Sequence, residues 1–362
     1  MTTAILSHAD TDTSLFRGAI MQTIRTVERL AQNLYRYGAK SSVALGLPMA
    51  PSLRIPIPQN PRPEVLTYES AREMISVFQL GLSEAEAILA NITAPHVQLR
   101  MHIGTVTVDI KGNGAAHPLW MLMSRLRREH PITQREGEEF YIKFDRGDVH
   151  WFRGYCHLLM GLCDWLLAHD WEESFNFGAS ILFSKVQSPY ARLKSRGHSE
   201  IIDIAAMVHS IHWKVTEQQR MLTALHHFEM VPAQSKESWE WIMKETEDDH
   251  EWLPNPRQTG VFPGAKVTGE MVVSWQKMMA QGALILAGEV LVPFWRGDDD
   301  GSGINVRKLF TEPGTFDLIN WVHGCALMPY LESGKAVATR SEFREVETAF
   351  GRNLPLLAIW FN

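Results

Sequence analysis

DVHWFRGYCHLLMGLCDWLLAHDW, residues 148–171, is the segment from which the architecture of this chain can be predicted most directly. On a helix, at about 100° per residue, four polar side chains fall within a sector of roughly 60°: His150, Arg153, His157 and Asp164. Most of the other positions are apolar, aromatic or small. A helix that is apolar nearly all round is a buried helix. The segment therefore predicts a central helix whose narrow polar stripe needs partners, because unpaired buried polar groups are costly.

Helical periodicity recurs on both sides of this central segment. Asp148 is the residue expected to cap the central helix, and Thr67 is the expected N-cap of a long helix that ends near residue 92. Further helices are predicted at residues 13–37, 118–128, 200–227, 236–249, 270–289, 316–330 and 341–351. The fold class expected from this pattern is mainly α, a multi-helix globular body.

A small β-sheet is expected in the first half of the chain. Residues 97–101 and 105–110 alternate and are rich in branched side chains, and residues 139–144 could add a third strand. We expect these segments to pair in one small antiparallel sheet. Residues 1–362 are predicted to form a single, predominantly helical domain, with a faint internal echo between residues 61–90 and residues 254–287.

Composition and charge exclude several function classes. The net charge of −6 argues against nucleic acid as a partner, since nucleic-acid binders carry a basic surface. No stretch approaches the roughly 18 apolar residues of a membrane span. The chain has three cysteines, Cys156, Cys163 and Cys325, and this odd number without a disulfide framework indicates a reducing compartment. A cytoplasmic protein is therefore expected.

The polar stripe of the central helix has two readings. In the structural reading, Arg153 pairs with Asp164 or with another carboxylate, and the histidines are satisfied in the interior. In the functional reading, the stripe lines a cleft in which His157 carries protons and Arg153 grips a small anionic ligand. The second reading makes the protein an enzyme, and it requires an open pocket at these residues.

No metal-ligand set or cofactor motif stands out, so the cofactor is unknown and no metal residue is assigned. Glu247 and His250 form one Glu-x-x-His pair, but a carboxylate-bridged metal site needs two. The run at residues 245–251 is mostly acidic, which is typical of a solvated surface. A divalent-metal-binding protein remains a weaker alternative.

Tryptophan and methionine are abundant, with 12 and 16 copies. Such side chains either fill the core or line an adaptable apolar groove. Trp295 and Arg296 form the candidate binding surface, because Trp and Arg dominate binding hot spots. Together with the lack of a catalytic motif, these features favour a non-catalytic helical protein that binds a ligand or a protein partner.

Overall fold

The computed structural model describes residues 8–43, 53–54, 57–126, 132–190, 193, 199–262, 266–297, 301–339, 348–350 and 360–361. The fold is mainly α, as predicted. The α-helices are α1 (His8–Arg36), α2 (Tyr68–Ala90), α3 (Leu119–Leu126), α4 (Gln134–Glu139), α5 (Arg146–Ala168), α6 (Glu172–Leu182), α7 (Ser199–His209), α8 (Gln218–Ile242), α9 (Gly269–Ala287), α10 (Lys308–Thr311) and α11 (Leu318–His323). Two 3₁₀ helices are η1 (Ile103–Thr105) and η2 (Cys325–Tyr330).

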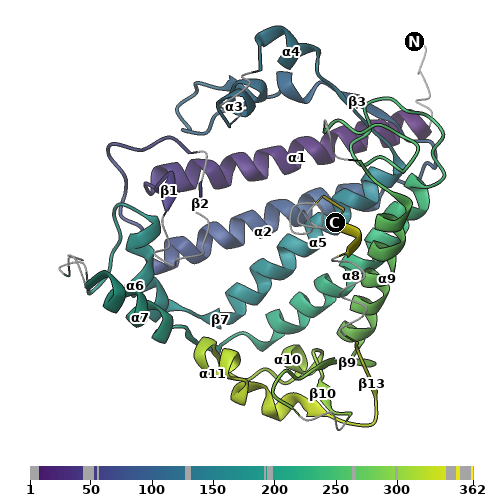
Figure 1. Ribbon diagram of the computed structural model, residues 1–362. Helices are drawn as coiled ribbons and strands as arrows, with labels where there is room; N and C mark the ends of the chain where they lie inside the picture. Colours follow the sequence, from purple (N-terminus) through teal and green to yellow (C-terminus); the bar gives the residue numbers. More distant parts are fainter. Residues whose placement is uncertain are drawn as a thin grey trace.

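The long helices form the body of the molecule. Helix α1 packs on α2, α2 on α5, α5 on α8 and α8 on α9, and Figure 1 shows the first four running side by side. The predicted central helix, α5, thus has neighbours on both sides. Among the described residues, none of the helices has the length and uniform apolarity that a membrane crossing requires.

The helix starts follow local capping chemistry. Thr67 caps α2 as predicted, because its hydroxyl accepts the N–H of Ser70. The predicted cap of α5, Asp148, is wrong: Asp145 is the N-cap, and its carboxylate accepts the N–H of Gly147 at 2.8 Å. Asp148 lies three residues further on and accepts the N–H of Asp145 at 2.9 Å. The two aspartates form a reciprocal capping box, in which the first residue is the cap.

The strands are short. They are β1 (Ser42–Val43), β2 (Leu53–Arg54), β3 (Leu99–Met101), β4 (Thr107–Val108), β5 (His117–Pro118), β6 (Ile142–Phe144), β7 (His169–Asp170), β8 (His212–Val215), β9 (Val290–Pro293), β10 (Gly303–Ile304), β11 (Phe316–Asp317), β12 (Leu331–Glu332) and β13 (Ala336–Val337). In the first half, β1 pairs with β2, β3 with β6 and β4 with β5, all antiparallel. The expected early antiparallel structure is therefore present as separate two-stranded ladders.

Two more sheets, formed by strands from residue 169 onward, were not predicted from the sequence. One has the order β11-β8-β7 and is antiparallel, and the other has the order β12-β10-β9-β13. In the latter, β13 runs parallel to β9. Strands of two to four residues are too short to show a clear alternation of apolar and polar side chains.

The prediction for residues 200–249 is wrong in its boundaries. The chain forms α7, then β8, and then a single helix α8 that continues through Pro232 to Ile242. Proline removes one backbone hydrogen bond from a helix interior, and here the packing of α8 on α5 and α9 maintains the helix. Most of the helix predicted at residues 341–351 lies outside the described residues.

The largest apolar core lies among α1, α2, α5, β3 and β6. Phe16, Leu82, Leu89, Phe144 and Met160 are among its buried members. A second core joins the start of α5 to the end of α8 and to α9, and it is rich in tryptophan, with Trp151, Trp239, Trp275 and Trp360. These four tryptophans are core residues, which is one of the two roles expected from the composition.

Candidate functional site

The polar stripe of α5 lies in the interior of the helical layer, between α2 and α8. At one end His150 Nδ1 lies 2.9 Å from the side-chain oxygen of Gln234 on α8. At the other end Asp164 accepts a hydrogen bond from Arg220 of α8 at 2.7 Å. The side chain of Asp164 is only 2% exposed, so this ion pair neutralises a carboxylate that water scarcely reaches.

The middle of the stripe joins α5 to both neighbouring helices. Arg153 donates to Glu86 of α2 at 2.8 Å, and His157 Nδ1 lies 3.0 Å from His227 Nδ1 of α8. The neighbouring ring of His157 and the guanidinium of Arg153 lower the pKa of Glu86 to about 2, although burial acts in the opposite direction. Each of the four stripe residues therefore has a partner on a neighbouring helix.

A glycine on α5 allows this close approach of α8. A Cβ added at Gly161 would lie 2.8 Å from a ring carbon of Phe228, which is closer than real Cβ contacts. The ring of Phe228 thus occupies the space that any larger residue at position 161 would need. Small residues on the polar side of α5 therefore contribute to the close packing of α5 against α8.

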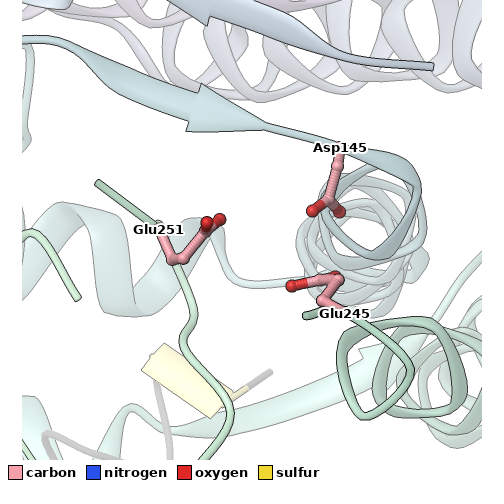
Figure 2. Close-up of side chains that lie close together, drawn as sticks. All are labelled: Asp145, Glu245 and Glu251. Carbon is pink, nitrogen blue, oxygen red and sulfur yellow. The ribbon is translucent and has the colours of Figure 1, made fainter. Parts of the chain in front are cut away.

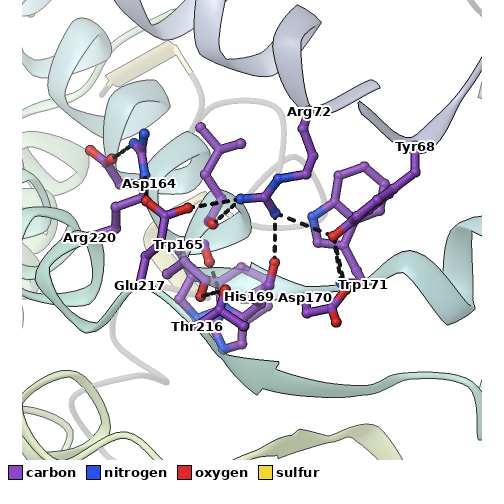
Figure 3. A network of polar contacts seen from close by, with 12 residues as sticks. Tyr68, Arg72, Asp164, Trp165, His169, Asp170, Trp171, Thr216, Glu217 and Arg220 are labelled. Atoms are coloured by element: carbon purple, nitrogen blue, oxygen red, sulfur yellow. Dashed lines mark hydrogen bonds and ion pairs between the residues drawn. The ribbon is translucent and has the colours of Figure 1, made fainter. Parts of the chain in front are cut away.

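The ion pair at Asp164 continues into a second network at the C-terminal end of α5 (Figure 3). Arg220 also pairs with Glu217 at 2.9 Å, and Glu217 pairs with Arg72 of α2 at 3.0 Å. Arg72 donates to the backbone oxygens of Leu167 and His169 at 2.7 and 2.9 Å. Carbonyl groups at a helix C-terminus have no partner within the helix, and Arg72 supplies one from α2.

A cluster of carboxylates forms at the opposite end of α5, next to its N-terminus (Figure 2). Ligand oxygens of Asp145, Glu245 and Glu251 all lie within 4.8 Å of one another, and Asp148 is buried beside them. Carboxylate oxygens are the ligands that calcium and magnesium prefer, so these three residues could hold a divalent cation. Glu251 is 2% exposed, so the interpretation of the acidic run as a solvated surface is wrong for this residue.

The segment after α8 folds back on the body and thereby buries the cluster. Asn255 is fully buried, and its side-chain amide donates to the backbone oxygen of Ile242 at 2.9 Å. Burial, and then the charge of Asp145, raises the pKa of Glu245 to about 10. Burial likewise raises the pKa of Glu251 to about 7 and the pKa values of Asp145 and Asp148. The cluster therefore retains protons that exposed carboxylates would release.

Replacing Glu251 with glutamine is expected to stabilise the protein above about pH 7. The pKa of Glu251 is about 7 in the folded chain and 4.5 ordinarily, so its contribution to stability is full below about pH 4.5 and is lost as the pH rises to about 7. Glutamine does not titrate, and its oxygen can still accept the N–H of Asp249. The gain should approach 2 kcal/mol, on the order of the pKa shift, in urea unfolding at about pH 8.

The control for this substitution is Glu139→Gln on α4, where the side chain is 65% exposed. Its effect on the free energy of unfolding should be small and the same at acid and alkaline pH. An effect of Glu251→Gln that does not change between about pH 5 and pH 8 would show that the buried carboxylate does not hold its proton.

Three pockets in the described part of the chain measure about 360, 440 and 310 Å³. The 440 Å³ pocket lies between α8 and α9 and carries the charged side chains Glu229, Lys236 and Glu240. The 310 Å³ pocket borders the carboxylate cluster and is lined mainly by polar side chains. None of the three is lined by His150, Arg153, His157 or Asp164.

The 360 Å³ pocket differs from the others because its wall is apolar. It lies among α2, α6, α7 and β8, and we call it the apolar pocket. Its wall consists of aromatic, aliphatic and methionine side chains together with one serine and one glycine: Leu66, Ala71, Met74, Ile75, Trp171, Ser174, Phe175, Gly178, Ala179, Ile181, Leu182, Phe183, Met207, Ile211 and Trp213.

Trp295 and Arg296 follow β9 on the surface. Trp295 is 50% exposed and its ring packs on Phe294. Arg296 donates to the backbone oxygen of His323 at 2.8 Å. Val322, which directly precedes His323 in the chain, and Met328 are large apolar residues that are 70% and 56% exposed.

Sequence reasoning missed both the carboxylate cluster and the apolar pocket. The signal for the cluster was the apolar Trp252-Leu253 that directly follows Glu251, because such residues draw the end of an acidic run into the core. The signal for the pocket was the apolar run of α6, residues 175–183, which was not assigned to any element. Comparison with protein-family models, with curated proteins and with solved structures gave no match.

Proposed function

We propose that this protein binds a small, uncharged, apolar molecule in the apolar pocket. The observation that carries the proposal is the chemistry of the wall. Ser174 is the one lining residue whose side chain bears a hydroxyl group. The hydroxyl of Ser174 donates to the backbone oxygen of Ser210 and accepts the indole N–H of Trp213, both at 2.7 Å. Since this hydroxyl is already engaged, the wall offers a ligand chiefly apolar contacts.

The lack of charge in the wall defines the class of ligand. A charged group loses its hydration on entering such a pocket and finds no counter-ion there, which is costly. An apolar ligand instead removes its own surface and that of the wall from water, at about 25 cal/mol per Å². Ligand pockets of proteins usually have volumes between about 300 and 1,000 Å³ and mainly apolar walls, and the pocket of 360 Å³ fits this description.

The volume limits the size of the ligand. An engineered cavity of about 150 Å³ binds benzene, so a pocket of 360 Å³ has room for an apolar molecule of roughly twice that size. A two-ring aromatic compound or a short alkyl chain has suitable dimensions. Trp171, Trp213, Met74 and Met207 supply the aromatic and adaptable surface that a groove of this kind uses.

The burial of the polar stripe does not support the enzyme alternative, in which the stripe lines an open cleft. A cleft along the polar stripe requires His157 and Asp164 to meet solvent, but their side chains are 8% and 2% exposed. The donors of Arg153 that would grip an anion are directed at Glu86 instead. The stripe therefore supports a structural role, in which it connects α5 to α2 and to α8.

The proposed site of action is a reducing compartment, the cytoplasm. The cysteines are free, and Cys325 is exposed at the start of η2. Exposed thiols persist in reducing compartments and tend to oxidise elsewhere. A protein partner at the exposed surface around Trp295 and Arg296 is compatible with ligand binding, because that surface is separate from the apolar pocket.

The environment-sensitive dye N-phenyl-1-naphthylamine tests the proposal. We expect it to bind with 1:1 stoichiometry, with enhanced dye fluorescence and energy transfer from Trp171 and Trp213 in the wall. Gly178→Phe, which fills the pocket, should weaken binding at least tenfold, or about 1.4 kcal/mol. A Cβ at position 178 would lie 3.2 Å from the flexible side chain of Met207, which can move.

The matched control is Gly18→Phe on α1, where a Cβ would meet nothing within 4 Å. Both substitutions replace a helical glycine with phenylalanine, so their effects on helix propensity are alike. Dye binding that is equal in wild type, Gly178→Phe and Gly18→Phe would contradict the proposal.

A further inference from the structure

Aromatic side chains at the apolar pocket form two separate clusters. In the first, Trp171 packs edge-to-face on Tyr68 at a centroid distance of 4.8 Å, and Phe175 lies 5.9 Å from Tyr68. In the second, the ring of Trp213 lies 5.6 Å from that of Phe316. Among the described residues, no ring of the first cluster contacts a ring of the second.

Both clusters reach the wall of the apolar pocket, the first through Trp171 and Phe175 and the second through Trp213. A molecule that fills the pocket therefore contacts both clusters. Aromatic rings attract one another beyond the burial of their surface, because the positive edge of one ring meets the negative face of another, and each such pair raises affinity by about two- to tenfold. An aromatic ligand gains this attraction from each cluster, and an alkyl chain gains it from neither.

We infer that the ligand of the apolar pocket is a planar aromatic compound with fused rings and no charged group. It lies between the two clusters and contacts rings of both. Fused rings follow from the volume of 360 Å³, which exceeds what a single ring needs. This inference rests on the proposed function and narrows its ligand from small apolar molecules in general to one chemical class.

Hydrogen bonds hold the aromatic rings of the wall in place. The indole N–H of Trp213 donates to Ser174 Oγ at 2.7 Å, and the backbone N–H of Trp171 donates to the hydroxyl of Tyr68 at 3.1 Å. That hydroxyl donates in turn to Asp170 at 3.1 Å (Figure 3). Side chains that are already ordered lose little freedom on binding, and a rigid fused-ring ligand has no internal freedom to lose, whereas an alkyl chain loses the freedom of its rotatable bonds.

Two methionines in the wall favour the same class of ligand. Met74 of α2 and Met207 of α7 both line the pocket. A thioether sulfur makes favourable contacts with the edge of an aromatic ring, and a saturated hydrocarbon offers no such partner. The flexible methionine side chains can also adjust to the outline of a flat ligand.

Naphthalene and decalin, its fully saturated counterpart, test the ligand class in the full-length protein. Decalin has the same carbon skeleton and a larger apolar surface, so burial of apolar area alone would make decalin the tighter ligand. We expect the opposite order, with naphthalene binding about tenfold more tightly. Both compounds are supplied through the headspace at known free concentrations, and displacement of N-phenyl-1-naphthylamine measures the affinity of each.

Replacing Phe175 with leucine should reduce this preference for naphthalene by about two- to tenfold, because it removes one ring from the wall and retains a buried apolar side chain. The matched control is Phe177→Leu on the same helix, where the ring stacks on Tyr190 at 4.4 Å and does not line the pocket. This control should keep the wild-type ratio of the two affinities. The ratio does not depend on a general loss of affinity that altered packing could cause.

The outcomes separate this inference from the proposal on which it rests. Decalin that binds the wild-type protein as tightly as naphthalene, or more tightly, would overturn the inference and leave the ligand-binding proposal standing. Equal ratios in folded Phe175→Leu and Phe177→Leu would also overturn it. If neither compound nor the dye binds, the proposed function itself is contradicted, and the inference with it. The comparison in the wild-type protein decides the question even if Phe175→Leu does not fold.

Discussion

Replacing Arg220 with methionine is expected to lower the free energy of unfolding by about 3–5 kcal/mol, as for other buried ion pairs that lose one partner. Arg220 is the residue that pairs with Asp164 at 2.7 Å, and the carboxylate of Asp164 is 2% exposed. Methionine retains much of the side-chain volume but leaves this carboxylate charged and poorly solvated. Total stabilities of single domains are about 5–15 kcal/mol, so urea unfolding should show a large shift of the midpoint.

Two further variants separate charge from packing in this prediction. Arg135→Met removes an arginine that is 85% exposed and pairs with Glu139 on the surface, and it should cost less than about 1 kcal/mol. Asp164→Asn added to Arg220→Met removes the stranded charge and should recover part of the loss. An Arg220→Met variant as stable as Arg135→Met would show that the packing of α5 on α8 does not depend on the ion pair.

Replacing Trp239 with alanine is expected to cost about 3–5 kcal/mol, the range for large-to-small substitutions of aromatic core residues. Trp239 has no exposed surface, and its ring packs on Phe361 at a centroid distance of 4.8 Å. It belongs to the core that joins the end of α8 to α9. The loss follows from the cavity left by the indole, and chemical denaturation monitored by circular dichroism measures it.

Phenylalanine at position 239 should be tolerated much better than alanine. The indole N–H of Trp239 is buried and makes no hydrogen bond within the described residues, so phenylalanine fills most of the space and removes an unsatisfied donor. We expect a cost below about 1.5 kcal/mol. Trp295→Ala, at a tryptophan that is 50% exposed, is the control and should change stability little. A loss with Trp239→Phe as large as with Trp239→Ala would contradict the packing argument.

The elements that the sequence predicted best are those whose signal is local. Thr67 marks the start of α2 because its hydroxyl caps that helix, and the nearly all-apolar α5 is buried because few of its side chains favour water. The break between α7 and α8 was missed because residues 210–217 carry no glycine or proline. There the chain leaves the helix to pair β8 with β7 and β11, which is a non-local interaction.

The candidate site could be predicted only in part for the same reason. The four stripe residues were found because helical geometry places them on one side of α5, yet their partners lie on α2 and α8 and have no recognisable spacing from them. Arg153, for example, pairs with Glu86, which is 67 residues away. The apolar pocket combines side chains from α2, α6, α7 and β8, and no local pattern shows that segments so far apart in the sequence leave a space between them.

Crystals of the protein grown with 2-bromonaphthalene test the proposed ligand site most directly, because anomalous scattering locates the bromine. The ligand-binding proposal predicts a bromine peak among α2, α6 and α7, in contact with Trp171, Phe175 and Met207 of the wall. The peak should be absent from Gly178→Phe crystals and present in those of Gly18→Phe. No peak in the apolar pocket of the wild-type protein at saturating ligand, or peaks only on the outer surface, would contradict it.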